Sequence, residues 1–421
     1  MRGQQDAQPR LFFTIDVQSR IRADHPLRDI KLRVDRILAA MTGSFDQAYS
    51  GMGRPSVPPE RLLKALLLQA LYSVRSETQL VERIYTDLLF RWFLDMDPED
   101  RVFEQTAFTH NRPRLEEHGL ITAFFDGVLK EALHADLCSE HFSVDGTMIE
   151  SYASTKSFQP KADLSDEATD SDSQSSVDDD SPNGVPDESG GSSSDSTMTQ
   201  SPKRAGIPKR SDSNPFKSRN PEVDFHGKKR TNETHQSRTD PEARLYRKGK
   251  GQPAHLAYLG HVLTENRHGL IINVAVTHAN GRAEPQAAID MIDTYKSRHG
   301  RQPKTVASDK GYDSGEYYLA LESRQIEPHG AMTSKEPRPE TAAKKNRERA
   351  EARSRMKERQ ASEGYRLSQR CRKKAEECIG WLKSIGGLSR SSHIGRSKTS
   401  QQMTLTGAAF NLVRLRKLSP A

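Results

Sequence analysis

Three carboxylic acids stand at positions where they could share one chemical task, although they lie far apart along the chain. Asp145 ends the strand-like stretch His-Phe-Ser-Val, Asp309 follows the short run Thr-Val-Ala-Ser, and Glu376 lies in a late helical pattern. Carboxylate oxygens are ligands that Mg²⁺ prefers, and Mn²⁺ can take its place. Two such ions about 4 Å apart activate an attacking oxygen and stabilise a leaving one, so this set predicts metal-dependent phosphodiester chemistry.

Taken singly, each acid has a plainer explanation. Asp145 could be a polar residue at the end of a strand, Asp309 could belong to a turn, and Glu376 could form a salt bridge on an amphipathic helix. Salt bridges of that kind are common on helix surfaces. The interpretation of the three acids as one site therefore depends on whether the fold brings them together.

The helical pattern around Glu376 suits a ligand that faces phosphate. At about 100° per residue, Arg372 and Lys383 point within roughly 40° of Glu376, while the adjacent Glu377 points elsewhere. The opposite face carries an apolar stripe made of Cys371, Ala375, Cys378 and Leu382. We therefore expect a packed back, a carboxylate between two cations on the front, and a solvated or salt-bridged Glu377.

The elements that would hold these acids follow a definite order after residue 140. Strands are predicted at 141–147, 255–261, 270–277 and 305–308, and helices at 284–295, 314–323, 365–383 and 401–415. This order matches an RNase H-like core, in which a mixed sheet flanked by helices has its first strand beside its fourth. The predicted fold class is thus α/β, with Asp145 next to Asp309 and Glu376 brought across the same edge.

Residues 1–137 have a helical pattern. Pro58 and Pro59 suit a helix start, Ser76-Glu-Thr-Gln79 predicts the cap of a helix running through Trp92, and further helices are expected at 103–115 and 120–133. Several short helices with tight turns indicate a helix-turn-helix bundle. In that bundle Arg112 and Arg114 are candidates for DNA contact, and the alternative is a packing domain with solvated arginines.

Composition and charge indicate the kind of partner. The 421 residues carry a formal net charge of +7, with a hydrophobic share of only 33%. Acid is concentrated around 163–195, so the remainder is more basic than the sum implies, which fits a polyanion such as nucleic acid. Three scattered cysteines argue against a disulfide framework, and no apolar stretch is long enough to span a bilayer. The expected location is the cytoplasm, without membrane contact.

The chain divides into two predicted regions. We expect a helical DNA-binding region at 1–137 and a catalytic domain at 138–421. The second is interrupted at about 161–220 by a segment rich in Ser, Asp, Gly and Pro. Because such a segment buries too little apolar surface to offset the entropy of ordering, it is predicted to be disordered.

Three motifs carry a resemblance to a known family. They are Phe142-Ser-Val-Asp145-Gly-Thr147, Ser308-Asp309-Lys-Gly-Tyr312-Asp313 and Arg372-Lys-Lys-Ala-Glu376-Glu-Cys-Ile-Gly-Trp-Leu-Lys383. In order and spacing they resemble the DDE transposases of bacterial insertion sequences, most closely the insertion-sequence-five group. That group has the signature Tyr, two residues, Arg, three residues, Glu, six residues, Lys. Arg372, Glu376 and Lys383 fit it, whereas Gln369 stands at the Tyr position.

The resemblance implies a function and a set of roles. Asp145, Asp309 and Glu376 would bind two Mg²⁺ ions, and Arg372 and Lys383 would contact DNA phosphate. The substrates would be double-stranded DNA, namely the inverted-repeat ends of the element and the target. A homodimer or higher oligomer would pair two ends in the cytoplasm of a bacterium, on its nucleoid. Metal-dependent cleavage and transfer of the freed 3′ end would follow.

Two other functions remain open at this stage. The chain could be a transposase-derived DNA-binding protein that no longer cuts, although the presence of all three acids argues against it. It could also be a host nuclease with the same core, which would cut without sequence-specific ends or strand transfer. The sequence does not reveal the inverted repeats, the target site or the excision route.

Overall fold

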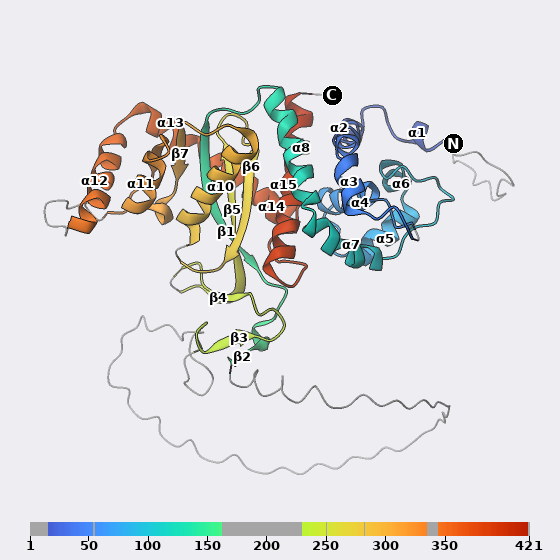
Figure 1. Ribbon diagram of the computed structural model, residues 1–421, viewed down its shortest axis with the longest axis horizontal. Helices are drawn as coiled ribbons and strands as arrows, with labels where there is room; N and C mark the ends of the chain where they lie inside the picture. The colour runs from blue at the N-terminus through green and yellow to red at the C-terminus, as the bar shows by residue number, and fades with distance from the viewer. Residues whose placement is uncertain are drawn as a thin grey trace, which may run out of the picture.

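A computed structural model describes residues 16–53, 55–161, 230–249, 251–281, 283–334 and 344–419. The insert predicted to be disordered at about 161–220 lies, apart from its first residue, outside the described residues. The fold consists of helices at the N-terminal end, a central sheet and further helices around that sheet (Figure 1). In the described part of the chain, no helix has the length and apolar character needed to cross a membrane.

The central sheet is mixed. Its strands are β1 (His141–Glu150), β4 (Arg244–Tyr246), β5 (His255–Glu265), β6 (Ile271–His278), β7 (Thr305–Ser308) and β8 (Glu327–Gly330). β5 pairs antiparallel with β1 and β6, and it also pairs with the short β4. β1, β7 and β8 run parallel to one another in that order. The first and fourth predicted strands are therefore neighbours, as an RNase H-like sheet requires, and β8 adds a strand that the sequence pattern did not indicate.

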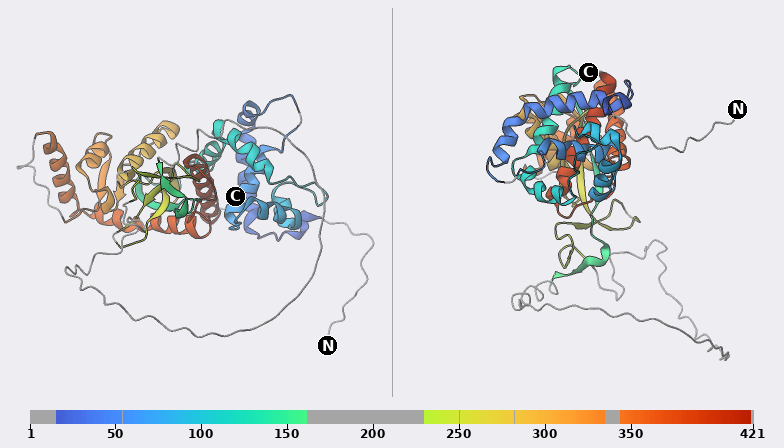
Figure 2. Two further views of the ribbon diagram at one scale, coloured as in Figure 1. Left: turned by 90° about the horizontal axis from the view of Figure 1, so that it is seen from below. Right: turned by 90° about the vertical axis from the view of Figure 1, so that its right-hand side faces the viewer.

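The sheet sits between helices. Those that follow the first strands are α10 (Ala283–His299), α11 (Gly315–Glu322), α12 (Lys344–Arg359), α13 (Glu363–Cys371), α14 (Lys373–Ser384) and α15 (Arg396–Leu418). α10 packs on β5 and β6, whereas α13 and α14 pack on β1 and its neighbours. The left view of Figure 2 shows α10 and α14 on opposite sides of the sheet. A separate small sheet pairs β2 (Phe158–Pro160) with β3 (His235–Ser237), after the single turn η1 (Thr155–Ser157).

The N-terminal region is helical, as predicted. Its elements are α1 (Val17–Arg20), α2 (Pro26–Ala40), α3 (Thr42–Ala48), α4 (Pro59–Leu71), α5 (Glu77–Thr86), α6 (Leu88–Phe93), α7 (Thr106–Glu117) and α8 (Leu120–His134). The Ser76 side chain caps α5, but the helix predicted through Trp92 is broken, because the Asp87 side chain accepts a hydrogen bond from the Leu89 backbone and starts α6. α7 continues through Pro113, since buried residues on both sides of it hold the helix in place.

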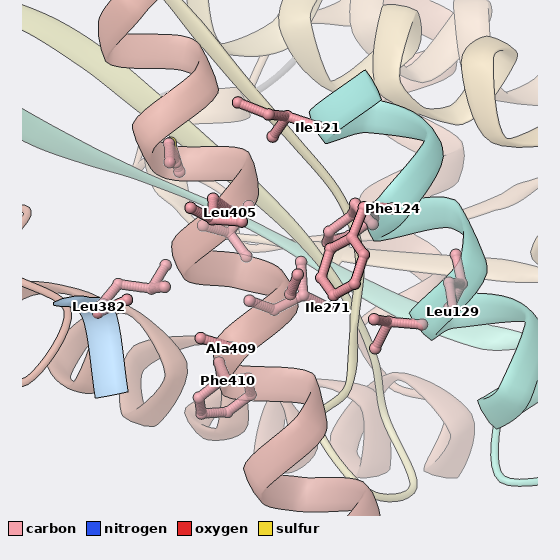
Figure 3. Packing of buried hydrophobic residues seen from close by; sticks show 14 of the residues in the cluster. Ile121, Phe124, Leu129, Ile271, Leu382, Leu405, Ala409 and Phe410 are labelled. Carbon is pink, nitrogen blue, oxygen red and sulfur yellow. The ribbon is translucent and has the colours of Figure 1, made fainter. Parts of the chain in front are cut away.

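One apolar core connects the N-terminal helices with the sheet. α15 packs against α8 and β6 and also contacts α2 and α4. Figure 3 shows Leu405, Ala409 and Phe410 of this helix near Phe124 of α8 and Ile271 of β6. α8 and α15 lie between the sheet and the remaining N-terminal helices (Figure 1). Burial of large apolar side chains at this junction fixes how the two regions are oriented.

The helix predicted at 365–383 is two helices that meet at Arg372. α13 is tied to strand ends, because the Ser368 hydroxyl bonds to the His329 ring and the Gln369 amide donates to the backbone of β7 and β8. α14 instead packs Ala375, Cys378 and Leu382 on the core, all buried as predicted, whereas Cys371, the fourth member of the predicted stripe, ends α13 and is only half-buried. The break at Arg372 allows each helix to follow its own surface.

A glycine in α11 generates a test of this packing. A Cβ on Gly315 would overlap the backbone of Arg349 in α12, whereas a Cβ on Gly380, inside α14, would meet no atom within 4 Å. We predict that Gly315→Ala lowers the free energy of unfolding by about 1–3 kcal/mol, since backbone cannot move aside cheaply. Gly380→Ala, the matched control, should raise it by about 0.5–1 kcal/mol. Urea denaturation measures both, and equal stability of the two variants would contradict the close approach.

Candidate active site

The pairing of β1 with β7 places two aspartates at one edge of the sheet. Ser143 lies opposite Ala307 at the end of the parallel register, and Asp145 and Asp309 each follow two residues later. Asp309 starts the single turn η2 (Lys310–Tyr312), and its carboxylate accepts the Gly311 N–H at 2.8 Å. The two carboxylates are thus held on neighbouring strands by buried backbone.

The charges of these aspartates act on each other. Burial, followed by the charge of Asp309, raises the pKa of Asp145 to about 6, although the Arg372 guanidinium opposes this rise. The Asp145 side chain is only 15% exposed, so water screens the repulsion weakly. Two carboxylates that repel each other in a partly buried place are a site that a cation would stabilise.

Arg372 connects Asp145 with the helix that carries Glu376. Its Nη1 lies 3.5 Å from an Asp145 carboxylate oxygen, and its Nη2 donates to Glu376 at 2.8 Å. The Glu376 side chain is 54% exposed. Glu377, one residue on, pairs with Arg414 at 2.9 Å, as its predicted position on the helix suggested. The front of α14 therefore links to the aspartate edge through a guanidinium.

The three acids do not form a compact metal cluster in this conformation. Within the described ranges, no group of three or more His, Cys, Asp or Glu side chains is arranged to hold a metal ion. Glu376 does not join the aspartates because its carboxylate is hydrogen-bonded to Arg372. The donor chemistry of Asp145 and Asp309, two hard oxygens at one edge, nevertheless fits a divalent cation such as Mg²⁺.

Lys383 lies on the same helix, two turns beyond Glu376, and is half-buried. Burial and then the charge of Lys248 lower its pKa, and Glu150 opposes the effect. Lys383 and Lys248 repel each other, so a bound anion such as phosphate would stabilise this pair, as a cation would stabilise the two aspartates.

The two arginines predicted from the N-terminal pattern are not brought to the carboxylates. Arg112 is buried and forms an ion pair with Glu77. Arg114 stacks over the Tyr49 ring, with 4.5 Å between its guanidinium carbon and the ring centroid. Both already have partners within the N-terminal helices, so their contact with DNA stays a prediction.

A fourth carboxylate, Glu284 in the first turn of α10, was missed by the sequence reasoning. Its carboxylate lies beside Gly146 and Gly311, the neighbours of the two aspartates in the chain, and burial, then Asp309, then Asp145 raise its pKa. Tyr312 lies at the same edge. Its ring is fully buried, and the charges of Glu284, Asp145 and Asp309 add to burial in raising the pKa of its hydroxyl. In the sequence Glu284 was an ordinary first-turn acid, because acids stabilise helix N-termini generally. Only the tertiary arrangement distinguishes it.

The raised pKa of Asp145 makes a prediction about stability. An acid with a folded pKa of about 6 against an ordinary 3.8 destabilises the folded state above pH 6, and this penalty vanishes as the pH falls toward 4. Asp145→Asn should therefore raise the free energy of unfolding by about 1–3 kcal/mol at pH 8 without divalent metal, and hardly at all at pH 4. Denaturation at both pH values measures the difference.

Asp313 provides a control of opposite sign. Burial alone would raise its pKa, but hydrogen bonds from Arg353 and Thr333 outweigh burial and lower the pKa below 3.8. Its ionised form stabilises the fold above pH 4, and that contribution is lost as the pH falls further. Asp313→Asn should thus lower stability at pH 8. A stabilising Asp313→Asn, or a destabilising Asp145→Asn, would refute this account of the edge.

Comparison with known protein families agrees with this architecture. Residues 15–114 match the transposase domain family DUF772, and residues 222–412 match the transposase DDE domain family. Together the two ranges cover about two thirds of the chain. The second range contains Asp309 and Glu376 and begins after Asp145, which joins it through the pairing of β1 with β5 and β7. Neither the curated proteins nor the solved structures contain a match.

Two family matches in the expected order, over a helical N-terminal region and an RNase H-like sheet, complete the identification. The chain belongs to the DDE transposases of the insertion-sequence type.

Proposed function

We propose that this transposase cuts DNA at the inverted-repeat ends of its element and joins the freed 3′ ends to target DNA. Asp145, Asp309 and Glu376 are the catalytic carboxylates in this proposal. The observation that carries it is the pairing of the parallel strands β1 and β7, which places Asp145 of β1 near Asp309, the residue directly after β7, with Arg372 linking that edge to Glu376. Carboxylates at one sheet edge suit phosphodiester cleavage, because they can hold the divalent cations that this reaction uses.

The two aspartates would hold the divalent cations, and Glu376 would complete the set after leaving Arg372. Bound Mg²⁺, or Mn²⁺ in its place, supplies charge stabilisation and activation of the attacking oxygen. The mutual repulsion that raises the pKa of Asp145 supports this assignment, because a cation removes its cause. The carboxylates orient the attacking water or 3′-hydroxyl through the oxygens that face the edge.

Arg372 and Lys383 are the proposed phosphate contacts. Without DNA, Arg372 is bonded to two carboxylates, and a phosphate arriving at the edge offers it a partner that frees Glu376. Lys383 stands near Lys248, so a phosphate between them would relieve the repulsion of two cations. Backbone phosphates would thus be held on both sides of the reacting bond.

The remaining parts of the proposal concern the whole assembly. Residues 1–137 would recognise the element ends, with Arg112 and Arg114 contributing if they exchange their internal partners for DNA, and residues 138–421 would carry out the chemistry. A homodimer or higher oligomer would pair two ends on double-stranded DNA. The place of action would be the bacterial cytoplasm, at the nucleoid.

A cleavage assay distinguishes this function from its two alternatives. A transposase-derived DNA-binding protein would bind element ends without cutting them in Mg²⁺. A host nuclease would cut DNA without regard to the ends and would not transfer strands. The substrate should therefore be a duplex carrying the inverted repeats that flank the coding gene, with a scrambled duplex beside it.

Two neighbouring glutamates give the sharpest test of the proposed carboxylates. Glu376→Gln should reduce cleavage by several orders of magnitude, a range consistent with the total catalysis that enzymes supply. Glu377→Gln is the matched control, since Glu377 pairs with Arg414 and should cost little beyond a surface substitution. Cleavage is measured at fixed Mg²⁺, and circular dichroism confirms folding. If Glu377→Gln were inactive and Glu376→Gln active, the catalytic role proposed for Glu376 would be wrong.

The phosphate contact of Lys383 predicts a change in salt dependence. Lys383→Ala should weaken DNA binding and reduce the slope of log affinity against log salt by about one, the change expected when one phosphate contact is lost. Lys373→Ala, on the exposed surface of the same helix, is the control and should change neither quantity. Fluorescence anisotropy at several salt concentrations measures both, and equal slopes for Lys383→Ala and wild type would exclude the contact.

A further inference from the structure

Glu284 occupies a space that two glycines leave open beside the catalytic aspartates. A Cβ on Gly146, directly after Asp145, would lie 2.7 Å from Glu284 Oε1. A Cβ on Gly311, two residues after Asp309, would lie 2.9 Å from Glu284 Oε2 and 3.0 Å from Asp309 Oδ1. The two distances to Glu284 are shorter than real Cβ atoms show, so the Glu284 carboxylate can occupy this position only while both residues are glycines.

The Glu284 carboxylate has no hydrogen-bond or ion-pair partner among the residues that the structure describes. Glu284 is half-buried, and the fully buried acids of the described fold, Asp240 and Glu265, differ from it because they have hydrogen-bond partners. Asp240 accepts hydrogen bonds from the hydroxyls of Ser151 and Tyr258, and Glu265 accepts several backbone N–H groups at the β5–β6 turn. Glu284 is instead aimed at two further carboxylates, and Lys248 is the cation whose charge acts on it.

A second observation points to a ligand at this place. The Tyr312 side chain is only 1% exposed, and its hydroxyl lacks a hydrogen-bond partner in the described part of the chain. The carboxylates that act on this ring are Glu284, Asp145 and Asp309. A buried hydroxyl without a partner normally has a water molecule or a ligand beside it, because an unsatisfied buried polar group is costly.

A role as a helix-capping charge does not account for Glu284. An acid in the first helical turn stabilises the helix N-terminus from any position that faces the positive end. That benefit is available from a solvent-facing residue and needs no approach to two like charges. The approach itself is costly without a cation and favourable with one.

From these contacts we infer that Glu284 is a fourth carboxylate of the active site and a ligand of the divalent cation held by Asp145 and Asp309. The inference rests on the proposed cleavage function. It assigns to α10, on the face of the sheet opposite α14, a ligand that can reach the aspartate edge while Glu376 is still bonded to Arg372. Because the described residues hold no preformed group of three metal ligands, the side chains of Glu284 and the two aspartates would close around the cation when it binds, and they could do so before DNA displaces Arg372.

The test is Mn²⁺ binding by the full-length, DNA-free protein, measured from the electron paramagnetic resonance signal of free Mn²⁺. Glu284→Gln should weaken Mn²⁺ binding by about tenfold or more, the loss expected when a group that holds a metal is removed. Asp145→Asn serves as the reference for a lost ligand. Glu363→Gln, which removes an exposed acid from the first turn of α13, is the matched control and should bind like the wild type.

The possible outcomes separate the two proposals. Wild-type affinity in a folded Glu284→Gln, beside weak binding by Asp145→Asn, would overturn the role of Glu284 and leave the proposed function intact. Absence of Mn²⁺ binding and of DNA cleavage by the wild type would overturn both. If Glu284→Gln does not fold, as judged by circular dichroism, Glu284→Asp is measured instead. Its shorter reach should weaken binding, and unchanged affinity would refute the inference.

Discussion

The parallel pairing of β1 with β7 forces two like charges, Asp145 and Asp309, to share one edge of the sheet. The register cannot relax this contact, because β7 is buried on both faces and a shift by one residue would exchange the side chains packed on each face. The repulsion between the Asp145 and Asp309 carboxylates therefore lowers the stability of the folded state. Arg372 offsets part of it, and a bound cation would offset the rest.

The helices on the α14 side of the sheet are tied to that same edge by two residues of the family signature. Arg372 connects Asp145 with Glu376, and Gln369, at the position where the signature has Tyr, donates its amide to the Ser308 carbonyl at 3.2 Å and to that of His329. Ser308 directly precedes Asp309. At this position the Gln369 amide holds two strand ends together, since it can donate to two carbonyls.

Local periodicity explains what the sequence could predict. The strand before Asp145, the apolar face of α10 and the buried stripe of α14 follow from patterns of two and of three to four residues, which depend on neighbours in the chain. Asp145 was predicted as a site residue from its strand context and its motif, although it lies outside the matched DDE range. These features needed no knowledge of distant partners.

What the sequence could not predict depends on such partners. Arg112 was a candidate for DNA contact, but its burial and ion pair with Glu77 appear only when α7 packs against the start of α5. Glu284 was not predicted as a site residue, because it comes close to Asp309 only when α10 packs on the sheet. The break at Arg372 was likewise not predicted. It arises because α13 is bonded to the ends of β7 and β8, whereas α14 packs on the apolar core. β8 was missed because its short run, Glu-Pro-His-Gly, has no apolar pattern.

The basic stretch before α13 shows why charge in a sequence is a poor measure of free cationic surface. Arg355 and Arg359 of α12 both bind Glu322 of α11, and Arg353 binds Asp313. These guanidinium groups hold α12 on α11, so binding a phosphate would first require breaking an ion pair. Lys383 and Lys248, which repel each other, form no ion pair with another described residue, although the charges of Glu150 and Glu284 act on Lys383 and Lys248 respectively. The affinity for a polyanion should therefore depend less on the density of arginines than on the few cations, such as Lys383 and Lys248, that are not held in ion pairs within the described part of the chain.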